Sequence, residues 1–153
     1  MLVYFAYGSN MDPRHMHQRV PGARAVGPGK LSGFSLAFNV YSTEWEGGAA
    51  NLELDRDSYV WGVLWEVPED QAHGLDAYQG HPTFFRREDV VVVGPEGPVI
   101  AWTYRVAHQE GYVRPTDAYV NAMLSAIRVM GLPPEALDIV DRAAHPPRPS
   151  INT

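Results

Sequence analysis

The stretch best suited to chemistry is the N-terminal end of the chain, where apolar residues 2–7 run directly into Gly8-Ser9-Asn10. This pattern predicts a buried strand, then a tight loop, then a helix that begins near Pro13. Backbone N–H groups point outward at such a junction, so they can hold an anion or the oxyanion of a reaction intermediate. The loop is shorter than any phosphate-binding fingerprint, so an ordinary turn after a core strand fits the pattern equally well.

Residues that often act as nucleophiles or metal ligands are sparse in this chain. It has no cysteine, which excludes a thiolate nucleophile, a disulfide and a cysteine metal site. His15 and His17 lie two residues apart, so they face different sides of a helix and make a poor metal pair. Ser9 lacks the Gly-x-Ser-x-Gly surroundings of a nucleophile elbow, so we interpret it as a contact for an oxyanion or carboxylate.

Length and composition favour one globular domain, because 153 residues with 45% hydrophobic residues can bury a real core. The formal net charge of −6 argues against nucleic acid and anionic membranes as partners. No apolar segment is long enough to cross a bilayer, and no basic stretch precedes a hydrophobic one as in a signal peptide. We therefore expect a cytoplasmic protein that is a monomer or a homodimer.

The elements that position these residues are expected to be short, because 13 prolines and 14 glycines punctuate the chain. Apolar runs after the opening strand predict further strands at residues 34–38, 49–54, 59–67, 84–93 and 99–104. Residues 55–58 are predicted to turn between two of them. Residues 13–19 are expected to form a short helix, and a second helix is predicted from Pro68 to about Tyr78, with Gly80 as its stop.

The most strongly patterned helix is predicted from Thr116 to Met130, with Thr116 as its cap and an apolar stripe that includes Tyr119. Together these elements predict an α+β fold with a strongly curved or barrel-like sheet. We expect one domain over residues 1–142 and an extended, proline-rich tail over residues 143–153.

The opening motif Tyr4-Phe5-Ala6-Tyr7-Gly8-Ser9-Asn10 resembles the signature of the γ-glutamylcyclotransferases. The likeness continues through residues 45–49, 60–65, 75–80 and 117–119, so it covers nearly the whole domain. It implies a small mixed β-barrel flanked by helices, with the active-site cavity at one end. It also implies a reaction: the α-amine of a γ-glutamyl group attacks its own γ-carbonyl, and 5-oxoproline and a free amine or amino acid are released.

The resemblance implies a role for several residues. A small-molecule γ-glutamyl substrate would lie against Tyr119 and the opening motif, with the backbone N–H groups of the turn as oxyanion donors. No metal and no organic cofactor is required. The general base of the family is a glutamate immediately before the glycine of the Leu-Asp-x-x-x-Gly segment, and in this chain that position is Gln79.

Gln79 separates binding from catalysis, because an amide has nearly the shape of a carboxylic acid but does not accept and return a proton at neutral pH. Loss of a positioned base typically lowers the rate about 10²–10⁴-fold. Three interpretations stay open: a substitution introduced to trap a bound substrate, a natural chain that uses another base, or a binding protein without turnover. The alternative bases near the predicted site are His81, Glu44, Glu46 and Glu88.

The function expected from the sequence is therefore a γ-glutamylcyclotransferase-type acyltransferase or a variant of it with an altered catalytic residue. One alternative is a protein that binds γ-glutamyl or other small molecules on the same scaffold without turnover. Another is the removal of a γ-glutamyl protecting group in a biosynthetic pathway, which needs a pocket open enough for a bulky leaving amine.

Overall fold

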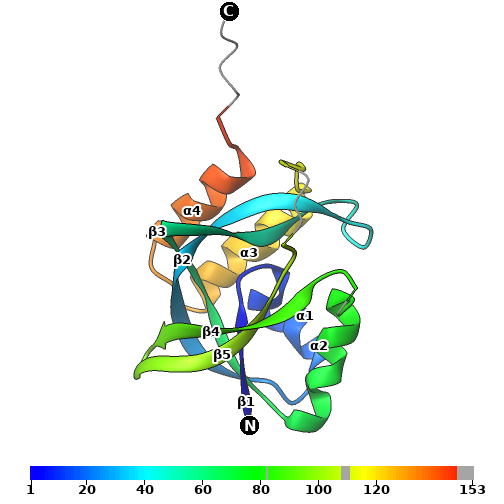
Figure 1. The fold of residues 1–153 in the computed structure, drawn as a ribbon, viewed down its shortest axis with the longest axis vertical. Coiled ribbons are helices and arrows are strands. Elements are labelled where there is room, and N and C mark those ends of the chain that lie inside the picture. The colour runs from blue at the N-terminus through cyan, green and yellow to red at the C-terminus, as the bar shows by residue number, and fades with distance from the viewer. Residues whose placement is uncertain (82, 108–110, 148–153) are drawn as a thin grey trace, which may run out of the picture.

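The structure, a computed structural model, describes residues 1–81, 83–107 and 111–147. At its centre is a closed barrel with the strand order β1-β3-β2-β4-β5 (Figure 1). The barrel is mixed, because β1 pairs in parallel with β5 while the other neighbouring strands pair antiparallel. The strands are β1 (Leu2–Ala6), β2 (Arg24–Ser42), β3 (Gly47–Val67), β4 (Arg86–Gly94) and β5 (Gly97–Arg105).

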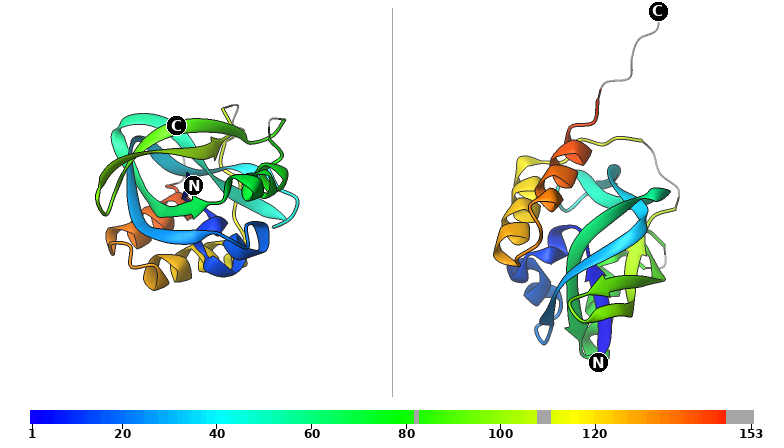
Figure 2. Two further views of the ribbon diagram at one scale, coloured as in Figure 1. Left: turned by 90° about the horizontal axis from the view of Figure 1, so that it is seen from below. Right: turned by 90° about the vertical axis from the view of Figure 1, so that its left-hand side faces the viewer.

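Helices cover the barrel unevenly. Figure 2 shows α1, α3 and α4 gathered on one side, opposite the β4–β5 hairpin. The α-helices are α1 (Pro13–Arg19), α2 (Ala72–Gln79), α3 (Asp117–Val129) and α4 (Glu135–Ala144), and the short 3-10 helices are η1 (Ser9–Met11) and η2 (Glu69–Gln71). The predicted α+β fold, a small mixed β-barrel flanked by helices, is therefore confirmed.

The two strands predicted at residues 49–54 and 59–67 are one continuous strand, β3, so that prediction is wrong. In the ladder with β2, Leu54 pairs with Phe34 and Tyr59 pairs with Ser32. Four residues of β3 therefore lie opposite a single residue of β2. Residues 55–58 therefore bulge out of the ladder without reversing the chain.

The turn chemistry read in those residues is nevertheless present. The Asp55 carboxylate accepts hydrogen bonds from the Asp57 backbone N–H at 3.2 Å and from the Ser58 hydroxyl at 2.8 Å. These bonds close a bulge within one strand, so the local signal was correct and the topology drawn from it was not.

The helix predictions were more accurate than the strand predictions. Thr116 caps α3 by accepting a hydrogen bond from the Tyr119 N–H at 3.2 Å, as predicted. Residues 13–19 form α1, also as predicted. α4 was not predicted, and the expected domain boundary at residue 142 falls inside it, because α4 continues to the buried Ala144. Of the predicted tail, residues 148–153 lie outside the described residues.

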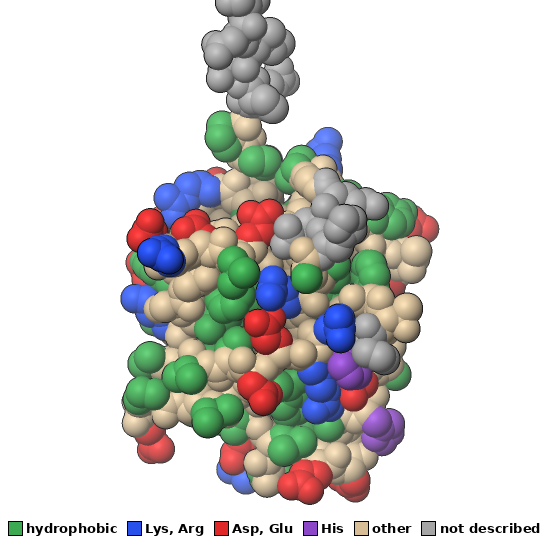
Figure 3. Space-filling view, in the orientation of Figure 1, with side chains coloured by type: hydrophobic (Ala, Val, Ile, Leu, Met, Phe, Trp, Pro, Cys, Tyr) green, Lys and Arg blue, Asp and Glu red, His purple; other side chains and the backbone are tan. Residues whose placement is uncertain are grey.

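The outer face of the β4–β5 hairpin carries exposed apolar side chains, namely Val91, Val93 and Ile100. Figure 3 shows apolar, acidic and basic side chains interspersed over this side of the molecule. No helix within the described residues has both the length and the hydropathy needed to cross a membrane.

Candidate functional site

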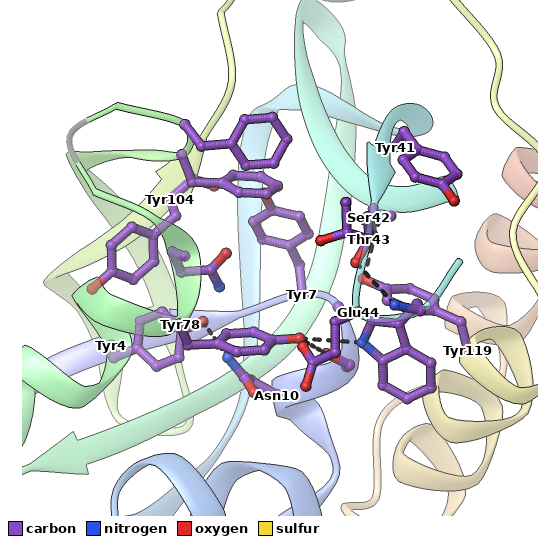
Figure 4. Close-up of a pocket in the computed structure, with 18 residues that line it drawn as sticks. Tyr4, Tyr7, Asn10, Tyr41, Ser42, Thr43, Glu44, Tyr78, Tyr104 and Tyr119 are labelled. Carbon is purple, nitrogen blue, oxygen red and sulfur yellow. Dashed lines mark hydrogen bonds between the residues drawn. The ribbon is translucent and has the colours of Figure 1, made fainter. Parts of the chain in front are cut away.

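A cavity of about 340 Å³ lies beside the C-terminal end of β1. Figure 4 shows Tyr4, Asn10 and Tyr104 on one side of it and Ser42, Thr43 and Tyr119 on the other. Its lining comes from segments far apart in the sequence: Tyr4, Tyr7, Gly8, Ser9, Asn10, Tyr41, Ser42, Thr43, Glu44, Trp45, Ala49, Ala50, Tyr78, Gln79, Phe84, Phe85, Tyr104 and Tyr119.

A second hollow, of about 470 Å³, lies among β2, β3 and α4. It is larger and more open to solvent, but none of the residues predicted to bind substrate lines it. The smaller cavity is the candidate site, because the residues with the predicted chemistry meet there.

The turn after β1 places Ser9 and Asn10 on the cavity wall, where both residues are buried. The chain turns sharply here because α1 begins immediately afterwards. The Asp12 carboxylate caps α1 by accepting a hydrogen bond from the Arg14 backbone N–H at 2.9 Å, and Pro13 is the first helical residue.

The Tyr119 hydroxyl packs directly onto this turn. A Cβ atom at Gly8 would lie 2.7 Å from the Tyr119 hydroxyl oxygen, so a side chain there would displace the tyrosine or the turn. The same hydroxyl accepts a hydrogen bond from the Ala50 N–H at 3.1 Å and interacts with the Ser9 N–H. Tyr119 therefore links α3 to the backbone of both β3 and the turn.

The end of α2 carries Tyr78 and Gln79 to the cavity. Gly80 ends the helix in the left-handed conformation, with φ at 67°, as the sequence predicted. The Tyr78 hydroxyl lies 3.4 Å from Ser9 Oγ and accepts a hydrogen bond from Trp45 Nε1 at 3.2 Å. The helix end is thus joined to the turn on one side and to the β2–β3 connection on the other.

The Gln79 side chain interacts with the Tyr4 hydroxyl. The Tyr4 hydroxyl accepts a hydrogen bond from Asn10 Nδ2 at 3.4 Å. Burial raises the pKa of Tyr4 to about 12, although hydrogen bonds with Asn10 and Gln79 act in the opposite direction. Asn10 Oδ1 is buried and has no hydrogen-bond partner among the described residues. An N–H group of a bound molecule would satisfy that oxygen.

Three further tyrosines of the wall have pKa values raised mainly by burial, namely Tyr7, Tyr104 and Tyr119. Tyr7 donates a hydrogen bond to the Tyr104 carbonyl oxygen at 2.5 Å, and the Tyr104 hydroxyl donates to Asp76 Oδ1 at 2.5 Å. At neutral pH these hydroxyls stay protonated, so they do not act as bases.

Most of the predicted site residues meet at the cavity: Tyr4, Tyr7, Gly8, Ser9, Asn10, Gln79 and Tyr119. Phe5 and Ala6 do not line it and are completely buried. Successive side chains of a strand point to opposite faces, so Phe5 points away from the face that Tyr4 presents. These two predicted contacts therefore lie in the core behind the wall.

Sequence reasoning did not assign a substrate-facing role to much of the wall, namely Tyr41, Ser42, Thr43, Trp45, Ala49, Ala50, Tyr78, Phe84, Phe85 and Tyr104. Two of these had a usable signal, because Tyr78 precedes Gln79 and Trp45 lies just before the glycine pair at residues 47–48. The others come from strand ends and loops that only the closed barrel brings together.

Of the alternative bases, only Glu44 lies on the cavity wall. The ring of His81 accepts a hydrogen bond through Nδ1 from a backbone N–H of β4 at 3.2 Å. Glu88 forms an ion pair with Arg105 at 2.6 Å. Neither of these residues, nor Glu46, lines the cavity.

His15 and His17 point to different neighbours, as their spacing predicted. The His15 ring packs against Trp45 with ring centroids 5.2 Å apart. His17 Nε2 lies 3.0 Å from the Ala23 carbonyl oxygen, and its ring packs against Trp65. Within the described parts of the chain, no three His, Asp or Glu side chains are grouped so as to hold a metal ion.

Comparison with known proteins agrees with this geometry. Residues 4–121 match the family model described as "Gamma-glutamyl cyclotransferase, AIG2-like". The chain is 30% identical over 139 residues to gamma-glutamylcyclotransferase of Bos taurus and to that of Homo sapiens, covering 87% of this chain and 73% of each relative.

Solved structures give the same result. One named "Gamma-glutamyl cyclotransferase" superposes with a TM-score of 0.87 at 27% identity, over 99% of this chain and 92% of the other. YkqA from Bacillus subtilis, at 23% identity, shares the fold with a TM-score of 0.81 over 95% of this chain and 54% of its own. The chain therefore belongs to the gamma-glutamyl cyclotransferase, AIG2-like family.

Proposed function

We propose that the cavity binds the γ-glutamyl group of a small molecule and that the chain converts it to 5-oxoproline, releasing an amine. The observation that carries the proposal is the meeting of the turn at residues 8–10, the end of α2 at Gln79 and the Tyr119 hydroxyl on one cavity wall. Family membership supports the same reaction.

The reaction first needs the substrate to fold back, so that its α-nitrogen meets its γ-carbonyl carbon. A shaped cavity supplies this orientation and lowers the entropic part of the barrier. The wall is well suited to the task, because its neutral hydroxyls and amides are fixed by contacts with one another. Tyr78 is held by Trp45 and lies beside Ser9, and Tyr4 is held by Asn10.

The reaction next needs hydrogen-bond donors for the oxyanion of the tetrahedral intermediate. In our proposal the backbone of the turn at residues 8–10 supplies them, at the point where Gly8 allows close approach. Gln79 donates and accepts hydrogen bonds that hold the glutamyl head, but its amide takes no proton. The proton must therefore go to a different group.

The test is incubation of the purified chain with γ-glutamyl-alanine and a set of γ-glutamyl amines, with 5-oxoproline measured over time. We expect release above that of a heat-denatured sample. Gln79→Glu is the companion variant, because it places a carboxylate at the family's base position and should be at least as fast as the wild type. If neither protein releases 5-oxoproline from any of these compounds, the enzymatic proposal is refuted.

A second candidate function is binding of γ-glutamyl compounds without turnover, and Gln79 is the observation that favours it. Thermal stability distinguishes the two. A ligand at 100 times its Kd stabilises the folded state by about 2.7 kcal/mol. Stabilisation without 5-oxoproline release would support the binding function. Release of 5-oxoproline would exclude it.

A further inference from the structure

We propose that Glu44 is the general base of this cyclisation and accepts the proton that the Gln79 amide cannot accept. The inference rests on the proposed function and adds the group that moves the proton. It begins from the charges on the wall: among the described residues that line it, Glu44 is the only aspartate or glutamate, and none is a lysine, arginine or histidine.

The other ionisable groups of the wall are tyrosines. Burial keeps four of them, Tyr4, Tyr7, Tyr104 and Tyr119, protonated at neutral pH. A protonated phenol does not take a proton from an ammonium group. A carboxylate does, so Glu44 is the wall residue with the chemistry that the first step requires.

The β2–β3 connection holds Glu44 over the cavity. The Trp45 backbone N–H donates to Ser42 Oγ at 3.2 Å, which tightens the connection, and Glu46 adopts a left-handed conformation with φ at 55°. The Trp45 indole N–H reaches across to the Tyr78 hydroxyl. Figure 4 shows the Glu44 side chain directed toward that hydroxyl. The connection therefore places a carboxylate next to the end of α2.

Arg19 aligns this carboxylate. Its guanidinium lies 3.4 Å from Glu44 Oε1 and stacks over the Tyr78 ring at 3.6 Å from the ring centroid. A further hydrogen bond to the His15 carbonyl oxygen, at 2.9 Å, ties the guanidinium to α1. The Arg19 side chain is only 9% exposed, whereas that of Glu44 is 57% exposed. Arg19 thus fixes one carboxylate oxygen and leaves the other available for a substrate.

In the proposed step the Glu44 carboxylate takes a proton from the substrate's α-ammonium. The freed amine forms a C–N bond with the γ-carbonyl carbon, and the carbonyl oxygen becomes an oxyanion. The carboxylic acid then gives its proton to the leaving nitrogen. The carbonyl re-forms as the bond to that nitrogen breaks. The ring nitrogen loses its second proton to Glu44, which passes it to the released amine. The products are 5-oxoproline and an ammonium, and Glu44 is again ionised.

The experiment compares Glu44→Gln with Glu46→Gln. Glu46 lies two residues away in the same connection but does not line the cavity, so it is a matched control. We expect Glu44→Gln to lower kcat about 10²–10⁴-fold with KM nearly unchanged. Glu46→Gln should stay within about twofold of the wild type. Adding Gln79→Glu to Glu44→Gln should restore turnover, because a carboxylate returns to the cavity.

A pH profile separates a base from a merely structural residue. The pH profile of wild-type kcat should have an acidic limb that the Glu44→Gln profile lacks. If the wild type releases 5-oxoproline and Glu44→Gln is equally fast, only this inference fails. If Glu44→Gln instead raises KM and leaves kcat intact, Glu44 binds substrate and is not the base. If the wild type releases none but Gln79→Glu does, this inference fails, and if neither protein releases any, the proposed function fails as well.

Discussion

The contact between Gly8 and Tyr119 predicts an energetic coupling that unfolding experiments can measure. A methyl group at Gly8 would have its carbon 2.7 Å from the Tyr119 hydroxyl oxygen, but its next neighbours, Ala50 Cβ and Tyr119 Cζ, are at 3.6 and 3.8 Å. Only the hydroxyl obstructs it. Gly8→Ala should therefore cost about 1–3 kcal/mol, the usual range for an overpacked site.

Tyr119→Phe removes that obstruction at a cost of its own. The Ala50 N–H loses its acceptor at 3.1 Å, and an unsatisfied buried donor costs about 1–3 kcal/mol. The ring contacts with Phe38 and Trp45 are kept. The double variant should be no less stable than Tyr119→Phe alone, which gives a coupling energy of about 1–3 kcal/mol.

Urea unfolding of the wild type, the two single variants and the double variant measures this coupling. In thermal unfolding, a protein of this size should lose about 2–4 °C of Tm for each kcal/mol of destabilisation. The control pairs Gly8→Ala with Tyr112→Phe, because the Tyr112 hydroxyl donates to Ala144 rather than to the turn. That pair should be additive. Additivity of Gly8→Ala with Tyr119→Phe would refute the proposed packing of Tyr119 on the turn.

Two further predictions concern pH and the leaving group. Burial alone would raise the pKa of Asp76, but hydrogen bonds from Arg87 at 2.6 Å and Tyr104 at 2.5 Å outweigh it and hold the pKa below its ordinary value. The carboxylate therefore stabilises the fold above a pH of about 4, and this stability is lost as pH falls through the folded-state pKa. Asp76→Asn should lower the free energy of unfolding by about 1–3 kcal/mol at pH 7. The difference in unfolding free energy between the wild type and this variant should become smaller in acid. A difference that stays constant with pH would contradict this prediction. None of the described residues that line the cavity is a lysine or arginine, and Phe84 is half-exposed at it. A γ-glutamyl amine with an apolar leaving group should therefore have a kcat/KM roughly tenfold above that of γ-glutamyl-alanine, which corresponds to about 1.4 kcal/mol. Equal values in steady-state kinetics would show that the leaving carboxylate finds a cation elsewhere.

The sequence predicted the local features of the fold because those signals are carried by neighbouring residues. Thr116 as a cap, Gly80 as a left-handed stop and the turn chemistry of residues 55–58 are all present. The error at residues 55–58 concerned the topology, because these residues were predicted to turn between two strands and instead bulge out of one strand. Only the partner strand decides whether such a segment closes a hairpin or bulges out of a longer ladder.

α4 was not predicted, although its apolar residues have the spacing of an amphipathic helix. Its fully covered positions are Ala136, Val140 and Ala144, two of them alanines that carry little apolar signal. Residues 133 and 134, both prolines, also suggested a break, although proline is well tolerated at a helix start. The apolar spacing that follows these prolines is the signal that the prediction from sequence did not use.

The candidate site was predictable on one side only. The turn at residues 8–10, Gln79 and Tyr119 were named from the family motif. The facing wall, with Glu44 and Trp45, depends on how β2 and β3 carry their connection back over the barrel end. Periodicity and motifs do not encode where that connection lies relative to the turn at residues 8–10. The sequence therefore left four alternative bases, and the structure places one of them, Glu44, on the cavity wall.

The most direct test of the account is the release of 5-oxoproline from a γ-glutamyl amine by the wild-type chain, measured in parallel with Glu44→Gln. The account predicts steady release by the wild type and a loss of about 10²–10⁴-fold in the variant, while both proteins stay folded. No release from folded wild-type protein, together with none from Gln79→Glu, would contradict it.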